Sequence, residues 1–186
     1  MNLLKHLKNW AGVFALALVT SCGNEVDSKE KVLPKASLKD GGSATERRMA
    51  VLVRGHSSQK RTDLVWDAKL TSAARKRARD MGARAYFSHV DPDGHGPNWY
   101  VTQAGYRLPT QWKAFKAVNQ VESILAGHST AEKAFSRWME SPKHVSHLLA
   151  LNPFYQEQTR FGIGHVVVPN SPWLDYWVFV SAPPEK

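Results

Sequence analysis

The sequence has a single cysteine, Cys22, among its 186 residues. One cysteine excludes an intramolecular disulfide and a zinc finger built on cysteine ligands. Long apolar runs are lacking too: Trp10–Val19 has ten residues, whereas a helix needs about 20 to cross a bilayer. Acidic residues are scarce, at 16 Asp and Glu against 25 Lys and Arg, and the net charge is +9. This imbalance favours an anionic partner such as nucleic acid, an anionic membrane or an acidic glycan.

The N-terminus has the layout of an export signal. Lys5 and Lys8 precede the apolar run, and Val19–Cys22 ends it with small residues. The alternative is a buried helix that happens to come first in the fold. The segment resembles a bacterial lipobox, in which the cysteine is lipidated and becomes the mature N-terminus. The resemblance implies a signal peptide over residues 1–21 and acyl chains, such as palmitate, on Cys22, where two or more chains anchor stably.

An exported, lipid-anchored chain has a restricted set of partners. We expect it in the cell envelope, on the outer membrane or the cell surface, with the membrane as a partner through Cys22 and no contact with nucleic acid. Its positive charge then favours anionic lipid head groups or envelope polymers. Residues 22–43 are polar, contain Pro34 and Gly41–Gly42 and have no apolar period, which predicts a flexible tether ahead of a domain over residues 44–186.

Periodicity predicts helices followed by a small sheet. Helices are expected over residues 44–57, 67–85 and 97–104, from a capping box at Ser129–Glu132, and after Ser141–Pro142. Phe161–Val168 and Tyr176–Ala182 are β-branched and aromatic and predict an antiparallel pair. Val118–Ala126 is either a third strand or an irregular core segment. Together these elements indicate an α+β layered domain.

The second predicted helix carries an unusual density of positive charge on positions between its apolar residues. We interpret these side chains as a solvated face, with contact to an anionic surface as the alternative: Arg75, Lys76, Arg77, Arg79 and Arg84.

Three residues are candidates for a metal-binding or catalytic role. His89 follows the end of the basic helix, His144 begins the helix after Ser141–Pro142, and Glu122 lies among apolar neighbours. A carboxylate in an apolar segment needs a partner, because burying a lone charge is costly. Two neutral imidazoles and a carboxylate suit a divalent metal such as zinc. Taken singly, each histidine is also explained as a hydrogen-bonded core residue.

Four blocks in order carry a family resemblance. They are Leu64–Leu70 with the helix that ends at Phe87–Gly94; Gly105–Tyr106; Glu122–Gly127 with Trp138–His144; and Phe161–Gly164 with Tyr176–Trp177. The chain resembles the CAP superfamily of cysteine-rich secretory proteins, antigen 5 and pathogenesis-related proteins, in its bacterial branch. This implies an α-β-α sandwich, three layers around a small antiparallel sheet, with a cleft that gathers two histidines and two acidic residues. In several members the two histidines hold a divalent metal.

The family pattern carries over to this chain in part. His89 and His144 match the two family histidines and imply a metal site, and Glu122 matches one acidic residue. Ser123 and His147 stand where bacterial members usually have asparagine. We consider His147 a candidate third metal ligand, or a polar substitute for that asparagine.

The second acidic residue of the family usually lies between the first histidine and the Gly-Tyr pair. In this chain that stretch is residues 90–104, and its only acidic residues are Asp91 and Asp93, neither of which is a clear match. A calcium loop starting at Asp91 is excluded, because Thr102 stands at position twelve, where a bidentate glutamate is needed.

The resulting hypothesis is an envelope binding module whose cleft of His89, Glu122 and His144 recognises a lipid or glycan ligand. The alternative is a metal-dependent hydrolase of envelope peptides or glycans. There His89 and His144 would hold zinc, which lowers the pKa of water toward about 7, and Glu122 would be the general base. Catalytic zinc sites usually have three protein ligands, and this chain offers only two clear histidines. This difference favours a binding role over enzymatic activity.

Overall fold

The computed structural model describes residues 41–112 and 118–186. The predicted signal peptide, the lipidation site Cys22 and residues 22–40 of the predicted tether lie outside the described residues. Within the described ranges, no helix is long and apolar enough to cross a membrane.

The elements follow the predicted order closely. The helices are α1 (Ala44–Gly55), α2 (Ala68–Ala83), α3 (Pro97–Gln103), α4 (Ala131–Met139), α5 (Pro142–Leu148) and α6 (Pro153–Gln156), with a 3-10 turn η1 at Thr110–Trp112. The strands are β1 (Val65–Trp66), β2 (Glu122–Ala126), β3 (Arg160–Val167) and β4 (Asp175–Ala182).

The four strands form one sheet in the order β1-β3-β4-β2. β3 and β4 pair antiparallel from Arg160↔Ala182 to Val167↔Asp175, as predicted. The segment left open in the sequence is a strand, since β2 pairs antiparallel with β4. The antiparallel sheet expected from the sequence is confirmed for β2, β3 and β4, and the two-residue β1 adds a parallel pairing to β3 at one edge. A two-residue strand is too short for its sequence to indicate which strand it pairs with.

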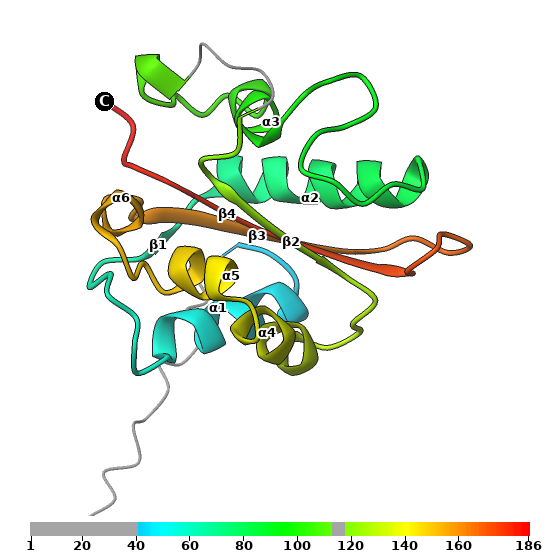
Figure 1. Ribbon diagram of the computed structural model, residues 1–186, viewed down its shortest axis with the longest axis horizontal. Coiled ribbons are helices and arrows are strands. Elements are labelled where there is room, and N and C mark those ends of the chain that lie inside the picture. The colour runs from blue at the N-terminus through cyan, green and yellow to red at the C-terminus, as the bar shows by residue number, and fades with distance from the viewer. Residues whose placement is uncertain (1–40, 113–117) are drawn as a thin grey trace, which may run out of the picture. The chain divides into compact units, whose positions relative to one another are not determined.

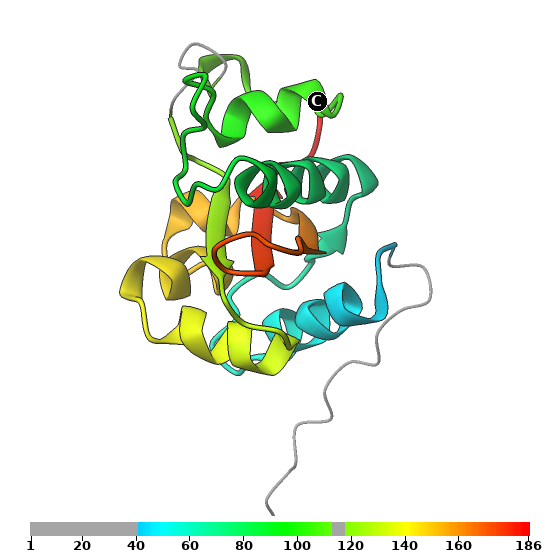
Figure 2. The same cartoon turned by 90° about the vertical axis from the view of Figure 1, so that its right-hand side faces the viewer.

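Helices cover both faces of this sheet and give the three layers expected. Figure 1 shows α2 and α3 on one side of the strands and α1, α4 and α5 on the other, and Figure 2 shows the same layers from the side. The contacts agree, since α2 packs on β3 and β4, α1 on β3, and α4 and α5 on β2.

β4 is buried along its whole length because it lies at the centre of this sandwich. Its side chains alternate between two apolar cores, as strand geometry requires. Tyr176, Val178 and Val180 face the core under α2, whereas Trp177 and Phe179 face the core that contains Trp138 of α4.

Two glycines allow α2 to lie directly against β3. A Cβ atom built on Gly162 would sit 2.2 Å from the backbone nitrogen of Thr71, and one on Gly164 would sit 2.4 Å from the carbonyl carbon of Ala74. Both contacts are to helix backbone, which has no side-chain freedom to move away. The Phe161–Gly164 block is therefore a packing motif, with its larger residues on the opposite face of the sheet.

Side-chain hydrogen bonds at the N-cap residues determine where helices α1 and α4 begin. Ser43 caps α1 in the predicted capping box: its hydroxyl accepts from the Glu46 backbone N–H, and the Glu46 carboxylate accepts from Ser43 N–H. The prediction for α4 is off by one residue, because Thr130 rather than Ser129 is the N-cap, with its side chain accepting from Lys133 N–H.

Candidate functional site

The predicted site residues line one cleft of about 500 Å³, which we call the histidine cleft. His89 lies in the loop after α2, Glu122 begins β2, and His144 is in the first turn of α5. The remaining lining residues are polar for the most part: Asn119, Ser123, Ser141, Lys143, Ser146, His147, Asn152 and Tyr155.

Glu122 is the buried anchor of the cleft, with its side chain 1% exposed. One carboxylate oxygen lies 2.9 Å from Nδ1 of His89, and the other accepts from Nε of Arg77 at 3.2 Å. Asn119 holds the backbone here: its carbonyl oxygen accepts from Glu122 N–H at 2.9 Å and its amide donates to Glu122 C=O at 2.9 Å. The carboxylate thus has a fixed position and two partners.

Arg77 is the residue that neutralises Glu122. Burial is the largest single influence and works against its charge, but the Glu122 carboxylate together with Tyr86 and Tyr100 outweighs burial and raises the pKa of Arg77 above its ordinary value. Arg77 also donates to the hydroxyl of Tyr86 and to the carbonyl of Ser88, the residue before His89. One guanidinium therefore holds both the acid and the loop that carries the first histidine.

Two groups contact Nδ1 of His89: a Glu122 carboxylate oxygen at 2.9 Å and the amide nitrogen of Asn119 at 3.1 Å. An ionised carboxylate can only accept, and this shorter contact favours the tautomer in which Nδ1 carries the hydrogen and donates it to Glu122. In the neutral ring the lone pair is then on Nε2, the nitrogen that can bind a metal. The side chain is 40% exposed, so this histidine is held by the protein and still open to solvent.

His144 lies near His89 in the same cleft. Burial lowers the pKa of His144 below its usual value, and the charge that His89 would carry lowers it further. His144 is therefore neutral at pH 7 and available as a nitrogen ligand.

His147 forms the floor of the cleft and is only 2% exposed. Its Nδ1 is 2.7 Å from the Ser123 hydroxyl and its Nε2 is 2.9 Å from the Ser181 hydroxyl. Ser181 donates to Gln158 at 2.6 Å, so its oxygen accepts from Nε2–H, and Ser123 must donate to Nδ1. Burial, followed by the charge of Arg61, lowers the pKa of His147 well below its usual value.

Comparison with known proteins agrees with this geometry. Residues 45–181 match the CAP family, the cysteine-rich secretory protein family, which is well over half of the chain. The chain belongs to the CAP family.

Among relatives, the uncharacterized protein YkwD of Bacillus subtilis is 28% identical over 138 residues, 74% of this chain and 48% of YkwD. The chain therefore spans about half the length of that relative.

Two solved structures share the CAP fold. An extracellular protein of Bacillus anthracis containing an SCP domain superposes with a TM-score of 0.58 at 20% identity, over 75% of this chain and 40% of that one. An outer surface protein of Borrelia burgdorferi superposes with a TM-score of 0.54 at 17% identity, over 79% of this chain and 99% of that one. At these identities the likeness establishes the fold.

The two positions at which this CAP domain departs from the expected asparagines touch each other. Ser123 and His147 make the 2.7 Å hydrogen bond at the cleft floor. Both nitrogens of His147 are used in this buried network, which favours the interpretation as a polar replacement for asparagine over that of a third metal ligand. Sequence alone gave no sign of the pairing, because the contact joins β2 to α5.

Asp91 and Asp93, the two candidates for the second family acid, do not line the histidine cleft. They form a separate cluster with His95, whose ligand atoms lie within 4.8 Å of one another, the one such three-residue group in the described ranges. Arg84 lies 2.6 Å from Asp93 and 3.2 Å from Asp91 and balances their charge. The hydroxyl of Tyr100 also donates to Asp91, at 2.8 Å.

Sequence reasoning missed Arg77 and Asn119. Arg77 was assigned to the solvated face of α2, and that is wrong, since it is fully buried. The signal was present: position 77 continues the spacing of Leu70, Ala73, Ala74 and Met81, which places it on the apolar face. Asn119 had no signal, because its role comes from the bend that leads into β2.

Proposed function

We propose that this CAP domain is a binding module of the cell envelope whose histidine cleft holds a divalent metal, through His89 and His144, and recognises a lipid or glycan ligand beside it. The observation that carries the proposal is the His89–Glu122 pair: a buried carboxylate orients the imidazole and leaves Nε2 as the ligand atom. Metal-binding histidines in proteins commonly have such a carboxylate on the other nitrogen.

The donor set fits zinc. His89 and His144 supply two imidazoles, and the lowered pKa of His144 keeps that ring neutral, as ligation requires. Bound zinc would supply a Lewis-acid centre with coordination positions left for an oxygen or nitrogen of the ligand. The polar lining of Asn119, Lys143 and Asn152 supplies hydrogen-bonding groups around that position.

A binding role is favoured over hydrolysis by the state of Glu122. A general base must lie within hydrogen-bond reach of the water from which it takes a proton. The Glu122 side chain is only 1% exposed, and its two oxygens contact His89 and Arg77, so the carboxylate faces protein groups rather than water. The carboxylate is therefore placed to position His89.

We also propose that the domain is exported and anchored through acyl chains on Cys22, at the outer membrane or the cell surface. The basic, apolar and small-residue sequence at the N-terminus supports this. The extracellular and outer-surface descriptions of the two structural neighbours point to the same compartment.

Zinc titration by calorimetry, on the full chain in nonionic micelles, tests the metal site. Wild type should bind one zinc ion, His89→Ala and His144→Ala should lose most of the affinity, and Glu122→Gln should lose about 10–100-fold because it removes the positioning partner. His128→Ala is the matched control, since His128 does not line the cleft. Absence of zinc binding by wild type, or loss with Asp91→Asn instead, would reject the proposal.

A further inference from the structure

The lining of the histidine cleft limits the kind of ligand that it can hold. None of the eleven described residues that line it has an aliphatic side chain, and Tyr155 supplies the one phenol ring among them. An acyl chain binds by leaving water for apolar surroundings, which this lining does not supply. The cleft volume of about 500 Å³ lies in the range of small-molecule sites, so we expect a compact polar ligand.

The accessible charge of the cleft is positive. Its one acidic residue, Glu122, is buried and contacts His89 and Arg77. Lys143 is exposed and lines the cleft, and it has no ion-pair partner among the described residues. One lysine balances one carboxylate, whereas a phosphate monoester carries about −1.5 to −2 charges at pH 7. A carboxylate oxygen is also an ordinary zinc ligand, so the lining favours a ligand with a single carboxylate.

Helical spacing places Lys143 beside the floor of the cleft. His147, the floor residue, follows Lys143 by four positions and His144 by three on α5, so the three side chains share one side of the helix. Both nitrogens of His147 are bonded to serine hydroxyls, which closes this ring to a ligand. The ammonium group of Lys143 therefore lies next to His144 at the proposed metal position, where one anionic group can meet both.

Hydroxyl and amide groups line the rest of the cleft. Ser141 is the N-cap residue of α5, but its side chain makes no capping hydrogen bond and is available to a ligand. The hydroxyl of Ser146 accepts from the amide of Asn152 at 3.0 Å and keeps its own hydrogen to donate. The Tyr155 ring packs on the His147 ring, with 4.7 Å between centroids, and adds a flat apolar surface. These groups match the hydroxyls and the apolar face of a sugar ring.

We infer that the histidine cleft binds a carboxylate-bearing sugar of an acidic glycan, with Lys143 on the carboxylate and Ser141, Ser146 and Asn152 on the sugar hydroxyls. This assignment rests on the proposed function of the cleft as a binding site and selects a glycan over a lipid. Zinc, where bound, would offer the same carboxylate an open coordination position. The net charge of +9 attracts a polyanionic chain to the domain.

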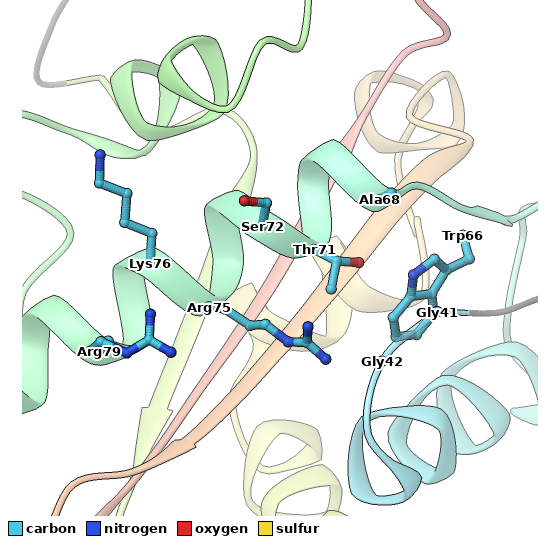
Figure 3. A pocket seen from close by; sticks show the side chains of 9 residues that line it. All are labelled: Gly41, Gly42, Trp66, Ala68, Thr71, Ser72, Arg75, Lys76 and Arg79. Atoms are coloured by element: carbon cyan, nitrogen blue, oxygen red, sulfur yellow. The ribbon is translucent and has the colours of Figure 1, made fainter.

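A second basic cavity, of about 510 Å³, lacks this convergence of groups. It is lined by Trp66 and by Arg75, Lys76 and Arg79 of α2 (Figure 3). Arg75 is held by Glu46, which accepts from its Nε at 2.8 Å. Figure 3 shows Arg79 at the opposite end of the cavity from Trp66. Arg79 is exposed like Lys143, so Arg79→Gln removes an equivalent charge outside the cleft and is the matched control.

Amide NMR on the full chain in nonionic micelles tests the inference with a matched pair of sugars. Methyl glucuronide and methyl glucoside differ only in the carboxylate or hydroxymethyl group on the ring. With chelator present, the glucuronide should shift the amide signals of Lys143 and Asn152 saturably. It should bind about threefold to tenfold more tightly than the glucoside, the range between an exposed ion pair and a charge-assisted hydrogen bond. Lys143→Gln should abolish this difference, and Arg79→Gln should retain it.

Two singly charged probes without a sugar ring, hexanoate and dimethyl phosphate, should bind more weakly than the glucuronide. Equal or tighter binding of either probe, or an equal loss in Arg79→Gln, would overturn the inference. Repeating the titration with zinc separates it from the proposed metal site. Glucuronide binding that persists in chelator while zinc does not bind rejects the metal alone, and zinc binding without a saturable sugar shift rejects the acidic sugar alone.

Discussion

The buried His147 makes the stability of the domain depend on pH in a way that can be isolated. In the folded protein burial and the charge of Arg61 keep the pKa of His147 well below its usual value, so the ring stays neutral in mild acid. In the unfolded chain the same ring titrates near 6.5. Below that pH only the unfolded state binds the proton, and the free energy of unfolding therefore falls as pH decreases.

The size of the effect follows from this difference. Between pH 7.5 and pH 5.0 an unfolded histidine with a pKa of 6.5 goes from mostly neutral to almost fully protonated, which stabilises the unfolded state by about 2 kcal/mol. His144, whose pKa is also lowered, contributes in the same direction but less, because it is only partly buried. Carboxylates such as Asp91, with a pKa lowered to about 2, lose their contribution only below pH 5.

Urea unfolding at pH 7.5, 6.5, 5.5 and 5.0, with chelator present to exclude metal, measures this dependence. Wild type should lose about 2–3 kcal/mol across the range. His147→Asn, which restores the amide expected at this position, should lose about 2 kcal/mol less than wild type over the same interval, whatever its stability at pH 7.5. Parallel pH curves for the two proteins would refute the assignment of His147 as a neutral, buried ring.

Three further substitutions test the core, the helix–sheet contact and the anchor. Trp138→Ala should lower the free energy of unfolding by about 3–5 kcal/mol in urea melts, since the ring is fully buried, and a loss of a few tenths would place it at the surface. Gly164→Ala should cost about 1–3 kcal/mol or more, because its Cβ meets the backbone of Ala74 at 2.4 Å; unchanged stability would contradict the close packing. Cys22→Ser should abolish incorporation of a labelled fatty acid in a bacterial host, and equal labelling of both proteins would reject the lipid anchor.

The parts of the fold that sequence predicted are those determined locally. The Ser43 capping box involves residues three apart, and β3 and β4 are adjacent in the chain and rich in β-branched and aromatic residues. The parallel pairing of the short strand β1 with β3 could not be predicted from local sequence, because it joins residues almost a hundred positions apart.

The residues of the histidine cleft could be predicted where they match the sequence blocks of the family. Residues whose roles depend on contacts between distant elements could not be predicted in this way. His89, Glu122 and His144 were found by their blocks, and they line one cleft. The burial of Arg77 is not expected from its charge, because it depends on the carboxylate of Glu122, which is distant in sequence and packs against Arg77 only in the folded domain. The Ser123–His147 bond joins two elements whose contact appears only when the sheet and α5 are packed together.

The central claim is that His89 and His144 hold a metal while Glu122 positions His89, and imidazole nitrogen NMR during a zinc titration tests it most directly. The account predicts that zinc shifts Nε2 of His89 and one nitrogen of His144, while Nδ1 of His89 keeps the proton donated to Glu122 and the His147 signals stay in place. Shifts confined to His95 would assign the metal to the Asp91 cluster, and zinc binding through Nδ1 of His89 would contradict the role of Glu122.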